Sequence, residues 1–200
     1  MEKVEKLLLN ECNYPLSEKI MERFLAPKEE IPLKKNEILV MSNVIDTNIY
    51  VVEDGILRFS YMDGLREVTF GFALPGTMII SMHSFYCHLP VFYQIEACCP
   101  SKVVKIPKKH YDTMVTESHD FARWALEMAN GQLFFYEKKN HIINGDAKER
   151  YLSLVHNRPD ILEKVPLKII ASYLGITQSY LSRLKKQIHQ NEQKKIKKRW

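Results

Sequence analysis

The chain has 200 residues, of which 46% are hydrophobic, and a formal net charge of +5 that is unevenly distributed. Residues 1–150 carry 18 basic and 21 acidic side chains, whereas residues 151–200 carry 11 basic and 3 acidic ones. No run is long and apolar enough to cross a bilayer, and we expect no secretory signal at the N-terminus. The basic end, with a balance of +8, predicts a polyanionic partner, with nucleic acid ahead of a membrane surface.

The four cysteines show no paired spacing, so we expect no disulfide framework and a reducing, cytoplasmic location. They are Cys12, Cys87, Cys98 and Cys99. No Ser-His-Asp set, carboxylate pair or phosphate loop stands out, which argues against an enzyme. His83, Cys87 and His88 lie close together in the sequence. Their spacing is irregular and the stretch is expected to be a loop, so neither a metal site nor another cofactor is predicted.

The first half of the chain combines helices with a β-rich region. Residues 1–25 are expected to be helical, and Pro27 ends the segment. From Ile31 to Pro107, short β-rich runs alternate with turn signals at Asp54-Gly55, Asp63-Gly64 and Leu74-Pro75-Gly76. The runs are EILVM, NIYVVE, ILRFSYM, REVTFGFAL, TMIIS, FYQIEACC and KVVKI. This pattern predicts a small antiparallel sandwich or barrel.

Residues 109–143 contain no proline and a single glycine, and apolar residues recur there at helical spacing. One track comprises Phe121, Ala125, Met128, Gln132, Phe135, Lys139 and Ile142, and a second comprises Leu126, Ala129, Leu133, Tyr136 and Ile143. One side of this helix is expected to lie on the β-rich region, and the other is covered either by the same chain or by a partner helix. Asn144-Gly145-Asp146 then predicts a helix stop, a hinge and the N-cap of the next helix.

The stretch LKIIASYLGITQSYLSRLKK, residues 167–186, has the pattern of a helix-turn-helix. A short first helix presents an apolar face, Gly175 allows the positive φ of a tight turn, and Thr177 is a good N-cap for the second helix. The positions expected to face the core are Ile169, Ile170, Ala171, Leu174, Ile176, Leu181 and Leu184. Because the motif lies on the basic segment, it predicts DNA binding; an ordinary helical corner would leave the charge unexplained.

The second helix of the motif leaves a polar face that could enter the major groove. The candidate base-reading residues are Gln178, Ser179 and Arg183, since Gln suits adenine and Arg suits guanine. The candidate phosphate contacts are Thr177, Tyr180, Ser182, Lys185 and Lys186. The C-terminal stretch QKKIKKRW carries five more basic residues, which either grip the DNA backbone or form a solvated end.

With these features in order, the chain resembles the cyclic-AMP receptor/FNR superfamily of bacterial transcription regulators along nearly its whole length. The resemblance implies an α+β fold. Residues 1–112 would form an antiparallel β-roll, a double-stranded β-helix like that of cyclic-nucleotide-binding domains, with N-terminal helices. Residues 113–143 would form a dimerisation helix and residues 146–200 a helix-turn-helix domain with a basic tail. Gly55, Gly64 and Gly76 match the turn glycines of the roll.

Three departures from the family limit what the resemblance implies. Nucleotide-binding members have a Gly-Glu-Leu segment and an Arg-Ser pair that holds the cyclic phosphate, where this chain has Gly76-Thr77-Met78 and Val91-Phe92. We therefore expect no cyclic-nucleotide binding, because the guanidinium fork is missing. Only Cys12 lies near the N-terminus, so no iron–sulfur cluster is expected. Residues 187–200 show no strand pattern for the β-hairpin wing found in many relatives.

Taken together, the sequence predicts a homodimeric regulator that binds a palindromic site in double-stranded DNA, with RNA polymerase as a further candidate partner. An unknown effector would bind in the roll, where the candidate pocket residues are Thr77, Met78, Phe92 and Tyr93. The neighbouring aromatic residues Phe85 and Tyr86 extend this group, although such a group of aromatic residues is more often plain core. The alternative is a ligand-sensing or redox-sensing module, the latter through Cys98-Cys99, whose basic end docks on a protein.

Overall fold

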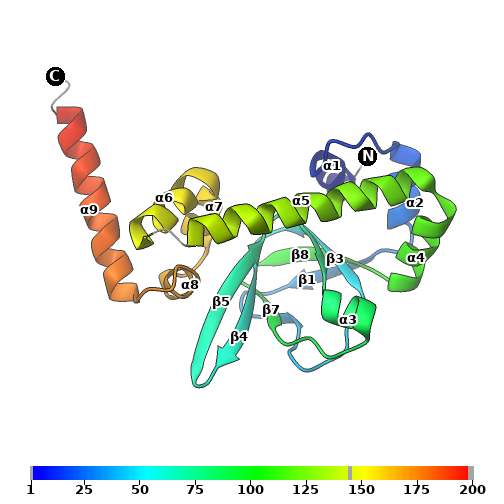
Figure 1. Ribbon diagram of the computed structural model, residues 1–200, viewed down its shortest axis with the longest axis horizontal. Coiled ribbons are helices and arrows are strands. Elements are labelled where there is room, and N and C mark those ends of the chain that lie inside the picture. Colours follow the sequence, from blue (N-terminus) through cyan, green and yellow to red (C-terminus); the bar gives the residue numbers. More distant parts are fainter. Residues whose placement is uncertain (1, 144–145, 198–200) are drawn as a thin grey trace. The chain divides into compact units, whose positions relative to one another are not determined.

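The computed structural model describes residues 2–143 and 146–197, without the side chains of residues 138–143, 189 and 191–197. The chain divides into two compact units, Met1–Lys139 and Asn140–Trp200. The first unit contains all the described strands and the second unit is helical throughout its described part (Figure 1). None of the described helices is long and apolar enough to span a membrane.

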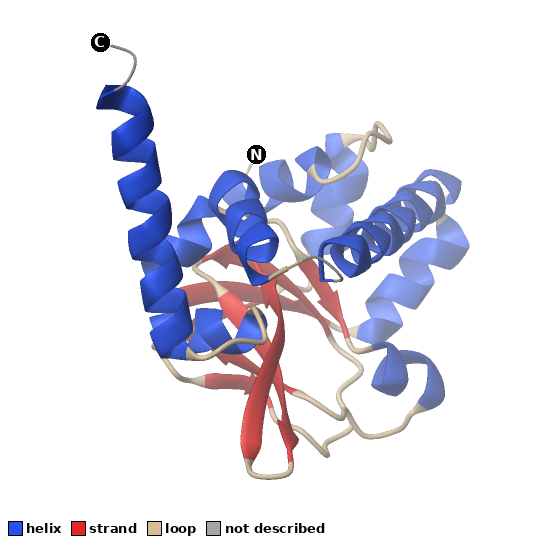
Figure 2. Cartoon of the chain, turned by 60° about the vertical axis from the view of Figure 1, so that its left-hand side comes forward, coloured by secondary structure: helices blue, strands red, loops and turns tan. Residues whose placement is uncertain are grey.

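Two four-stranded sheets form the centre of the first unit (Figure 2). One has the order β1-β8-β3-β6 and the other β2-β7-β4-β5, and all neighbouring strands are antiparallel. The strands are β1 (Glu29–Leu33), β2 (Ile38–Val40), β3 (Ile49–Asp54), β4 (Leu57–Asp63), β5 (Arg66–Ala73), β6 (Met78–Ile80), β7 (Gln94–Ala97) and β8 (Ser101–Ile106). The antiparallel roll predicted for this region is therefore confirmed.

Strand β3 lies between two hydrophobic cores because its side chains alternate between the two faces of its sheet. Ile49 and Val51 belong to a core shared with helices, whereas Tyr50 and Val52 belong to a core enclosed between the two sheets. All four side chains are buried, which explains why this run is apolar without alternation. The same sheet thus supports the helices on one face and closes the roll on the other.

The first core is shared with five of the described helices, of which α3 (Met82–Cys87) contributes Phe85 and the other four are longer. These four are α1 (Lys3–Asn10), α2 (Glu18–Leu25), α4 (Lys108–Glu117) and α5 (His119–Ile143). Phe24 on α2 meets Phe121 on α5 with ring centroids 4.8 Å apart, and Trp124 lies one turn further along α5, 5.4 Å from Phe121. This aromatic contact joins the N-terminal helices to the start of α5.

The stretch expected to form one helix over residues 113–143 is divided at Ser118. Its backbone is extended there (φ −129°, ψ 108°), and its hydroxyl accepts a hydrogen bond from the backbone N–H of Phe121 at 3.2 Å. Ser118 therefore caps the N-terminus of α5, while α4 begins after Pro107. The serine ahead of an apolar periodic run is the signal that could have predicted this break.

Two further local predictions need correction. The stretch around His83 and Cys87 is not a loop, because Met82–Cys87 form the short helix α3, which ends at His88 in the left-handed conformation (φ +52°). Strand β1 was not among the predicted runs. It contains Pro32 and two glutamates, and it can tolerate the missing N–H because it lies at a sheet edge.

The second unit comprises α6 (Ala147–Asn157), α7 (Pro159–Lys164), α8 (Leu167–Tyr173) and α9 (Gln178–Lys197). Asp146 caps α6 as predicted: its carboxylate accepts from the Glu149 N–H at 2.8 Å, and the Glu149 carboxylate accepts from the Asp146 N–H at 3.3 Å. The expected stop and hinge at Asn144-Gly145 lie outside the described residues. Buried apolar side chains from all four helices are Tyr151, Leu154, Ile161, Val165, Ile170, Ala171, Leu174, Leu181 and Leu184.

Candidate nucleic-acid interface

Helices α8 and α9 are joined by a short turn and pack against each other through the predicted core positions. Ala171 and Leu174 are buried at the end of α8, and Leu181 and Leu184 are buried in the first two turns of α9. Ile176, in the turn between them, is half-buried. Residues 167–186 thus contain the end-to-end pair of helices and the short turn on which the helix-turn-helix prediction depends.

The turn depends on Gly175, which has a φ of +66°. Its N–H donates to the Ser172 carbonyl at 3.1 Å, and the next N–H, of Ile176, donates to the Ala171 carbonyl at 3.0 Å. These two bonds satisfy carbonyls at the end of α8 and aim the chain into α9. Apart from its chain neighbours, no atom of the described residues lies within 4 Å of the position that a Cβ on Gly175 would take, so glycine is needed here for its backbone angle and not for space.

Thr177 caps α9, as predicted. Its hydroxyl oxygen accepts a hydrogen bond from the Tyr180 N–H at 3.2 Å, and its carbonyl accepts from the Leu181 N–H at 3.0 Å. The Thr177 hydroxyl proton is not used by the cap. It remains able to donate to an acceptor outside the protein, such as a phosphate oxygen.

The polar residues of α9 fall on the side away from the core. Ser179, Arg183 and Lys186 are exposed and lie three or four residues apart, so they share one face of the helix. Ser182, half-buried, borders this face, whereas Lys185 lies four residues after the buried Leu181 and projects from a flank. Gln178 is exposed in the first turn. The structure therefore brings Ser179 and Arg183 of the proposed base-reading set onto one face.

Tyr180 and Arg183 interact directly on α9. The guanidinium carbon of Arg183 lies 5.7 Å from the centroid of the Tyr180 ring, within the range of a cation–π contact. Both side chains are exposed. The sequence had placed Tyr180 among the phosphate contacts and did not predict this pairing.

The basic C-terminal stretch continues α9, whose helical backbone extends to Lys197. The side chains of the QKKIKKRW tail lie outside the described residues. Within residues 146–197 every regular element is a helix, so the described part of the second unit has no β-hairpin wing. This agrees with the absence of a strand pattern after residue 187.

The four residues proposed for an effector pocket are not brought together. The hydroxyl oxygen of Thr77 accepts from the Leu74 N–H at 3.2 Å within a turn, and Met78 packs against the helical core. Tyr93 packs against the core between the sheets, with its ring 5.5 Å from that of Phe70. Phe92 is 64% exposed. Because Met78 and Tyr93 serve different cores, these four residues do not line one pocket.

The β-strands contain two arginines, and neither offers a guanidinium to the interior of the roll. Arg58 is buried, and one of its terminal nitrogens donates to Glu67 and to Glu96, each at 2.9 Å. These residues alternate with the core residues Leu57 and Ile95, so they lie on the face of the sheet opposite the core. Arg66 is exposed at the tip of the β4–β5 hairpin.

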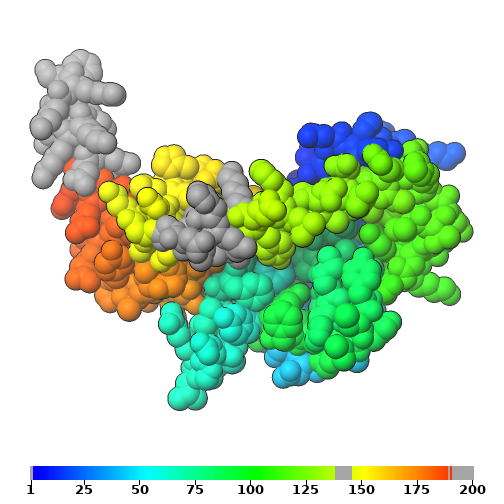
Figure 3. All heavy atoms as spheres, in the orientation of Figure 1, coloured from blue at the N-terminus to red at the C-terminus, as the bar shows by residue number. Residues whose placement is uncertain are grey.

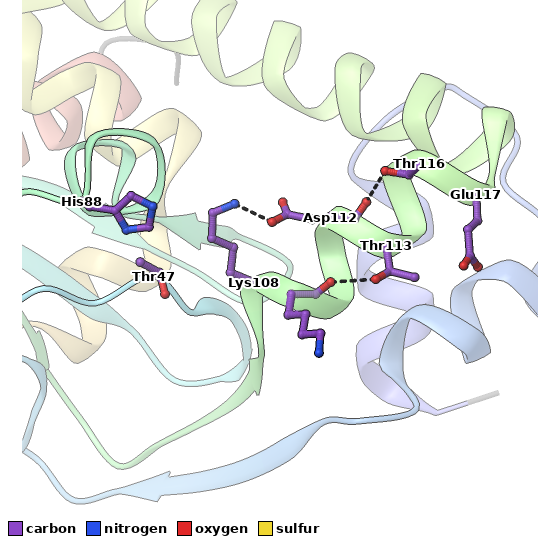
Figure 4. Close-up of a pocket in the computed structure, with 8 residues that line it drawn as sticks. Thr47, His88, Lys108, Asp112, Thr113, Thr116 and Glu117 are labelled. Atoms are coloured by element: carbon purple, nitrogen blue, oxygen red, sulfur yellow. Dashed lines mark hydrogen bonds and ion pairs between the residues drawn. The ribbon is translucent and has the colours of Figure 1, made fainter.

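A shallow groove of about 650 Å³ lies at the start of α4, lined by residues that include Thr47, His88, Lys108 and Asp112 (Figure 4). Lys108 is already engaged there, because its ammonium group is 2.6 Å from the Asp112 carboxylate and 4.3 Å from the centroid of the Phe85 ring. The hydroxyl of Thr113 donates to a backbone carbonyl of the same helix. The groove is therefore lined by side chains of both charges, and two of its donors, on Lys108 and Thr113, already have partners within α4.

The cysteine and histidine candidates are dispersed. His83 contacts the Pro90 carbonyl through Nδ1 at 2.8 Å, and Cys87 is exposed on α3. Cys98 is buried and Cys99 half-buried, the alternation expected of neighbours, although β7 ends before them at Ala97. Burial raises the pKa of the Cys98 thiol to about 12, which disfavours the reactive thiolate. Among the described residues, no three potential metal-binding side chains converge.

Comparison with known proteins shows what the fold and the β-rich region of the chain are similar to. Residues 30–118 match the family model of the cyclic nucleotide-binding domain, and no curated protein sequence is significantly similar to the chain. Among solved structures, FixK2 from Bradyrhizobium japonicum is 19% identical with a TM-score of 0.70, covering 82% of this chain and 86% of that chain. The c-di-GMP-responsive global regulator CLP from Xanthomonas campestris is 15% identical with a TM-score of 0.67, covering 88% and 93%.

The catabolite activator protein of Thermus thermophilus is also similar, at 12% identity and a TM-score of 0.56, covering 93% of this chain and 88% of that chain. Residues 30–118 are therefore similar in sequence to cyclic nucleotide-binding domains. The chain shares its fold with FixK2, CLP and the Thermus thermophilus catabolite activator protein, and this is the α+β fold that its sequence predicted.

Proposed function

We propose that this chain is a sequence-specific DNA-binding transcription regulator of cyclic-AMP receptor/FNR type. The observation that carries the proposal is the α8–α9 arrangement, in which Gly175 and Thr177 set the turn and the cap while Ser179, Arg183 and Lys186 share the exposed face of α9. The basic balance of residues 151–200 supports a polyanionic partner for this face.

In this proposal the first turns of α9 enter the major groove. Gln178 and Arg183 read adenine and guanine edges with paired hydrogen bonds, and Ser179 reads an edge with less discrimination. The residues proposed to contact phosphates are Thr177, Tyr180, Ser182, Lys185 and Lys186. The free hydroxyl proton of Thr177 and the flanking position of Lys185 suit contacts to the DNA backbone beside the groove.

We infer that the protein is a homodimer joined through α5. In the first of its predicted apolar tracks, Phe121, Ala125 and Met128 are buried in the helical core, whereas Phe135 is exposed. The second track is left uncovered, and Figure 3 shows side chains of α5 at the surface of the first unit (yellow-green). The exposed apolar residues of the second track include Leu126, Leu133 and Tyr136, with Leu133 64% exposed. The side chains of Lys139 and Ile142 in the first track and of Ile143 in the second lie outside the described set.

We infer that the second track packs against α5 of a second copy of the chain, since apolar residues at heptad spacing suit helix pairing. A two-fold dimer would present two α9 helices to successive major grooves. The operator is then a palindrome with half-sites about 34 Å apart, roughly one turn of DNA. An effector that prefers one pose of the paired DNA-binding units would shift their population and so regulate binding.

The roll does not suit a cyclic nucleotide, although its domain family is named for that ligand. A cyclic phosphate requires a cationic partner, but the Arg58 guanidinium is held by Glu67 and Glu96, and the family's Arg-Ser position is occupied here by Val91-Phe92. We therefore infer that the effector, where there is one, belongs to another chemical class. Isothermal titration with cyclic AMP and cyclic GMP should show no binding, and micromolar affinity for either would contradict this inference.

Fluorescence anisotropy with a labelled random-sequence duplex separates DNA binding from the alternative of a sensing module with a protein-docking end. We expect binding that weakens steeply between about 50 and 200 mM salt, because each phosphate contact releases a counterion. The same titration with Lys185 and Lys186 both changed to alanine should show a shallower salt dependence. No binding at low salt, or binding insensitive to salt, would overturn the proposed function.

A further inference from the structure

Tyr180 and Arg183 form a pair on the proposed DNA-reading face of α9. They lie three residues apart, one turn of helix, and helical side chains lean toward the N-terminus, so the side chain of Arg183 extends over the ring of Tyr180. The guanidinium carbon is 5.7 Å from the ring centroid. Tyr180 is 42% exposed, so its ring is not buried in the hydrophobic core of the second unit.

The ring is the contact that orients Arg183. Among the described residues, no hydrogen bond or ion pair to its guanidinium accompanies the ring contact. A guanidinium on an aromatic ring is attracted through its flat face, while its N–H donors project from its edges. The contact therefore leaves the donors available for the O6 and N7 acceptors of guanine.

We propose that Tyr180 is a positioning residue that holds Arg183 for base recognition, a role beyond the phosphate contact of its hydroxyl. This inference rests on the proposed function, because it needs Arg183 to read a base. An arginine side chain loses much rotamer freedom when it binds, and a ring that restricts it beforehand reduces that loss. Removal of the ring should therefore reduce the preference of the protein for the base that Arg183 reads.

The test uses the full-length protein and labelled duplexes carrying the consensus site enriched from a random DNA pool. A matched set of duplexes changes one base pair of the half-site at a time. Discrimination is the dissociation constant for the duplex changed at one position divided by that for the consensus duplex. It is compared between variants at the position that Arg183→Ala affects. The variants are Tyr180→Leu, which removes the ring, and Tyr180→Phe, which keeps the ring and removes the hydroxyl, each alone and combined with Arg183→Ala.

We expect Tyr180→Leu to reduce discrimination at that position about twofold to fivefold, the range of an exposed cation–π contact, without affecting the other positions. Tyr180→Phe should retain the discrimination even where the lost hydroxyl weakens binding to all duplexes. In the Arg183→Ala background, Tyr180→Leu should have no further effect on discrimination. The exposure of Tyr180 predicts unchanged thermal stability, checked by circular dichroism, for both single variants.

Three results would overturn the proposal. The first is a Tyr180→Leu variant that discriminates between the bases as well as the wild type does. The second is a Tyr180→Phe variant that loses as much discrimination as Tyr180→Leu, and the third is a Tyr180→Leu loss of the same size in the Arg183→Ala background. Failure of this proposal is distinguishable from failure of the proposed function. If Arg183→Ala leaves discrimination unchanged at every position, the base-reading assignment itself is wrong. If Arg183→Ala removes discrimination but Tyr180→Leu does not, only the positioning role is wrong.

Discussion

Arg183 and Lys186 lie one turn apart on the exposed face of α9, yet their side chains suit different contacts with DNA. The guanidinium of Arg183 can form two parallel hydrogen bonds to one base, which makes its contribution depend on sequence. The ammonium group of Lys186 is a compact charge that suits any phosphate. Exposure on a shared face therefore does not imply a shared role.

Replacing Arg183 by alanine should cost about 1–3 kcal/mol of binding to the preferred site and relax the preference at one base position. Lys186→Ala is the matched control: it should weaken binding to all sequences alike and reduce the slope of log affinity against log salt by about one unit. Both variants are measured by anisotropy on the preferred and random duplexes. Equal losses on both duplexes for Arg183→Ala would show that this residue reads no base.

The buried thiol of Cys98 should resist modification in the folded protein. Its raised pKa, about 12 against an ordinary value near 9, means that the neutral form predominates at pH 8 and that ionisation opposes folding as the pH rises from 9 toward 12. Iodoacetamide at pH 8 should modify the exposed Cys87 and leave Cys98 unmodified until urea unfolds the chain, as read by peptide mass spectrometry. Rapid labelling of Cys98 in the native protein would support the redox-switch alternative.

At the residue scale the core of the helix-turn-helix was predictable and the contacts on its surface were not. Ala171, Leu181 and Leu184 are buried as predicted, and Thr177 is the cap, because periodicity and capping chemistry are local properties of the sequence. The Tyr180–Arg183 contact depends on side-chain rotamers. Several rotamers are open to each exposed side chain, so the spacing alone does not predict it.

At the scale of elements, two turn glycines show why similar backbone angles have different consequences. Gly55 has a φ of +86° and Gly175 a φ of +66°. A Cβ on Gly55 would lie 2.7 Å from the Cα of Ser101, whereas a Cβ on Gly175 would have no neighbour within 4 Å. Both substitutions strain the backbone, but only the first also displaces the neighbouring strand β8.

We expect Gly175→Ala to lower the free energy of unfolding by about 1–2 kcal/mol, the cost of a left-handed residue with a Cβ. Gly55→Ala should cost clearly more, because of the added clash with the backbone. Urea denaturation followed by circular dichroism measures both, with Gly175→Asn as a milder control since Asn tolerates this conformation better than Ala. Equal losses for Gly55→Ala and Gly175→Ala would contradict this account of the two turns.

The exposed apolar track of α5 predicts that a single charge disrupts association. Leu133→Glu would bury an unpaired carboxylate in the proposed helix pair and should raise the dimer dissociation constant at least tenfold, an estimate at the low end of such burial costs. Leu65→Glu, the same substitution at a fully exposed position between β4 and β5, is the control and should have little effect. Sedimentation velocity at several concentrations gives both values. A monomeric wild-type protein at micromolar concentration would contradict the dimer.

Strong periodic elements were predictable, and elements whose role depends on tertiary position were not. The β3 run is apolar along its length because it lies between two cores, and its strand was recognised. Strand β1, with Pro32, is formed by pairing with β8, from Glu29 opposite Lys105 to Leu33 opposite Ser101. That pairing joins residues about 70 positions apart, a contact that local propensity does not reveal.

At the scale of the whole molecule, the charge division of the sequence corresponds to a division of folds. Residues 1–150, which have more acidic than basic side chains, include the two-sheet roll and its helices. The basic residues 151–200 lie within the helical second unit. The family resemblance implied this α+β order, and the structural comparisons confirm the fold. Met78 and Tyr93, two of the residues proposed for an effector pocket, pack against separate cores, which their positions in the sequence did not reveal.

Selection of binding sites from a random DNA pool by the full-length protein tests the central claim most directly. The account predicts enrichment of an inverted repeat whose half-site centres are about one helical turn, roughly 10 base pairs, apart, bound by two copies of the chain. Arg183→Ala should select the same repeat with one position of each half-site relaxed. A pool without an enriched motif, or a motif without two-fold symmetry bound by a single copy, would contradict it.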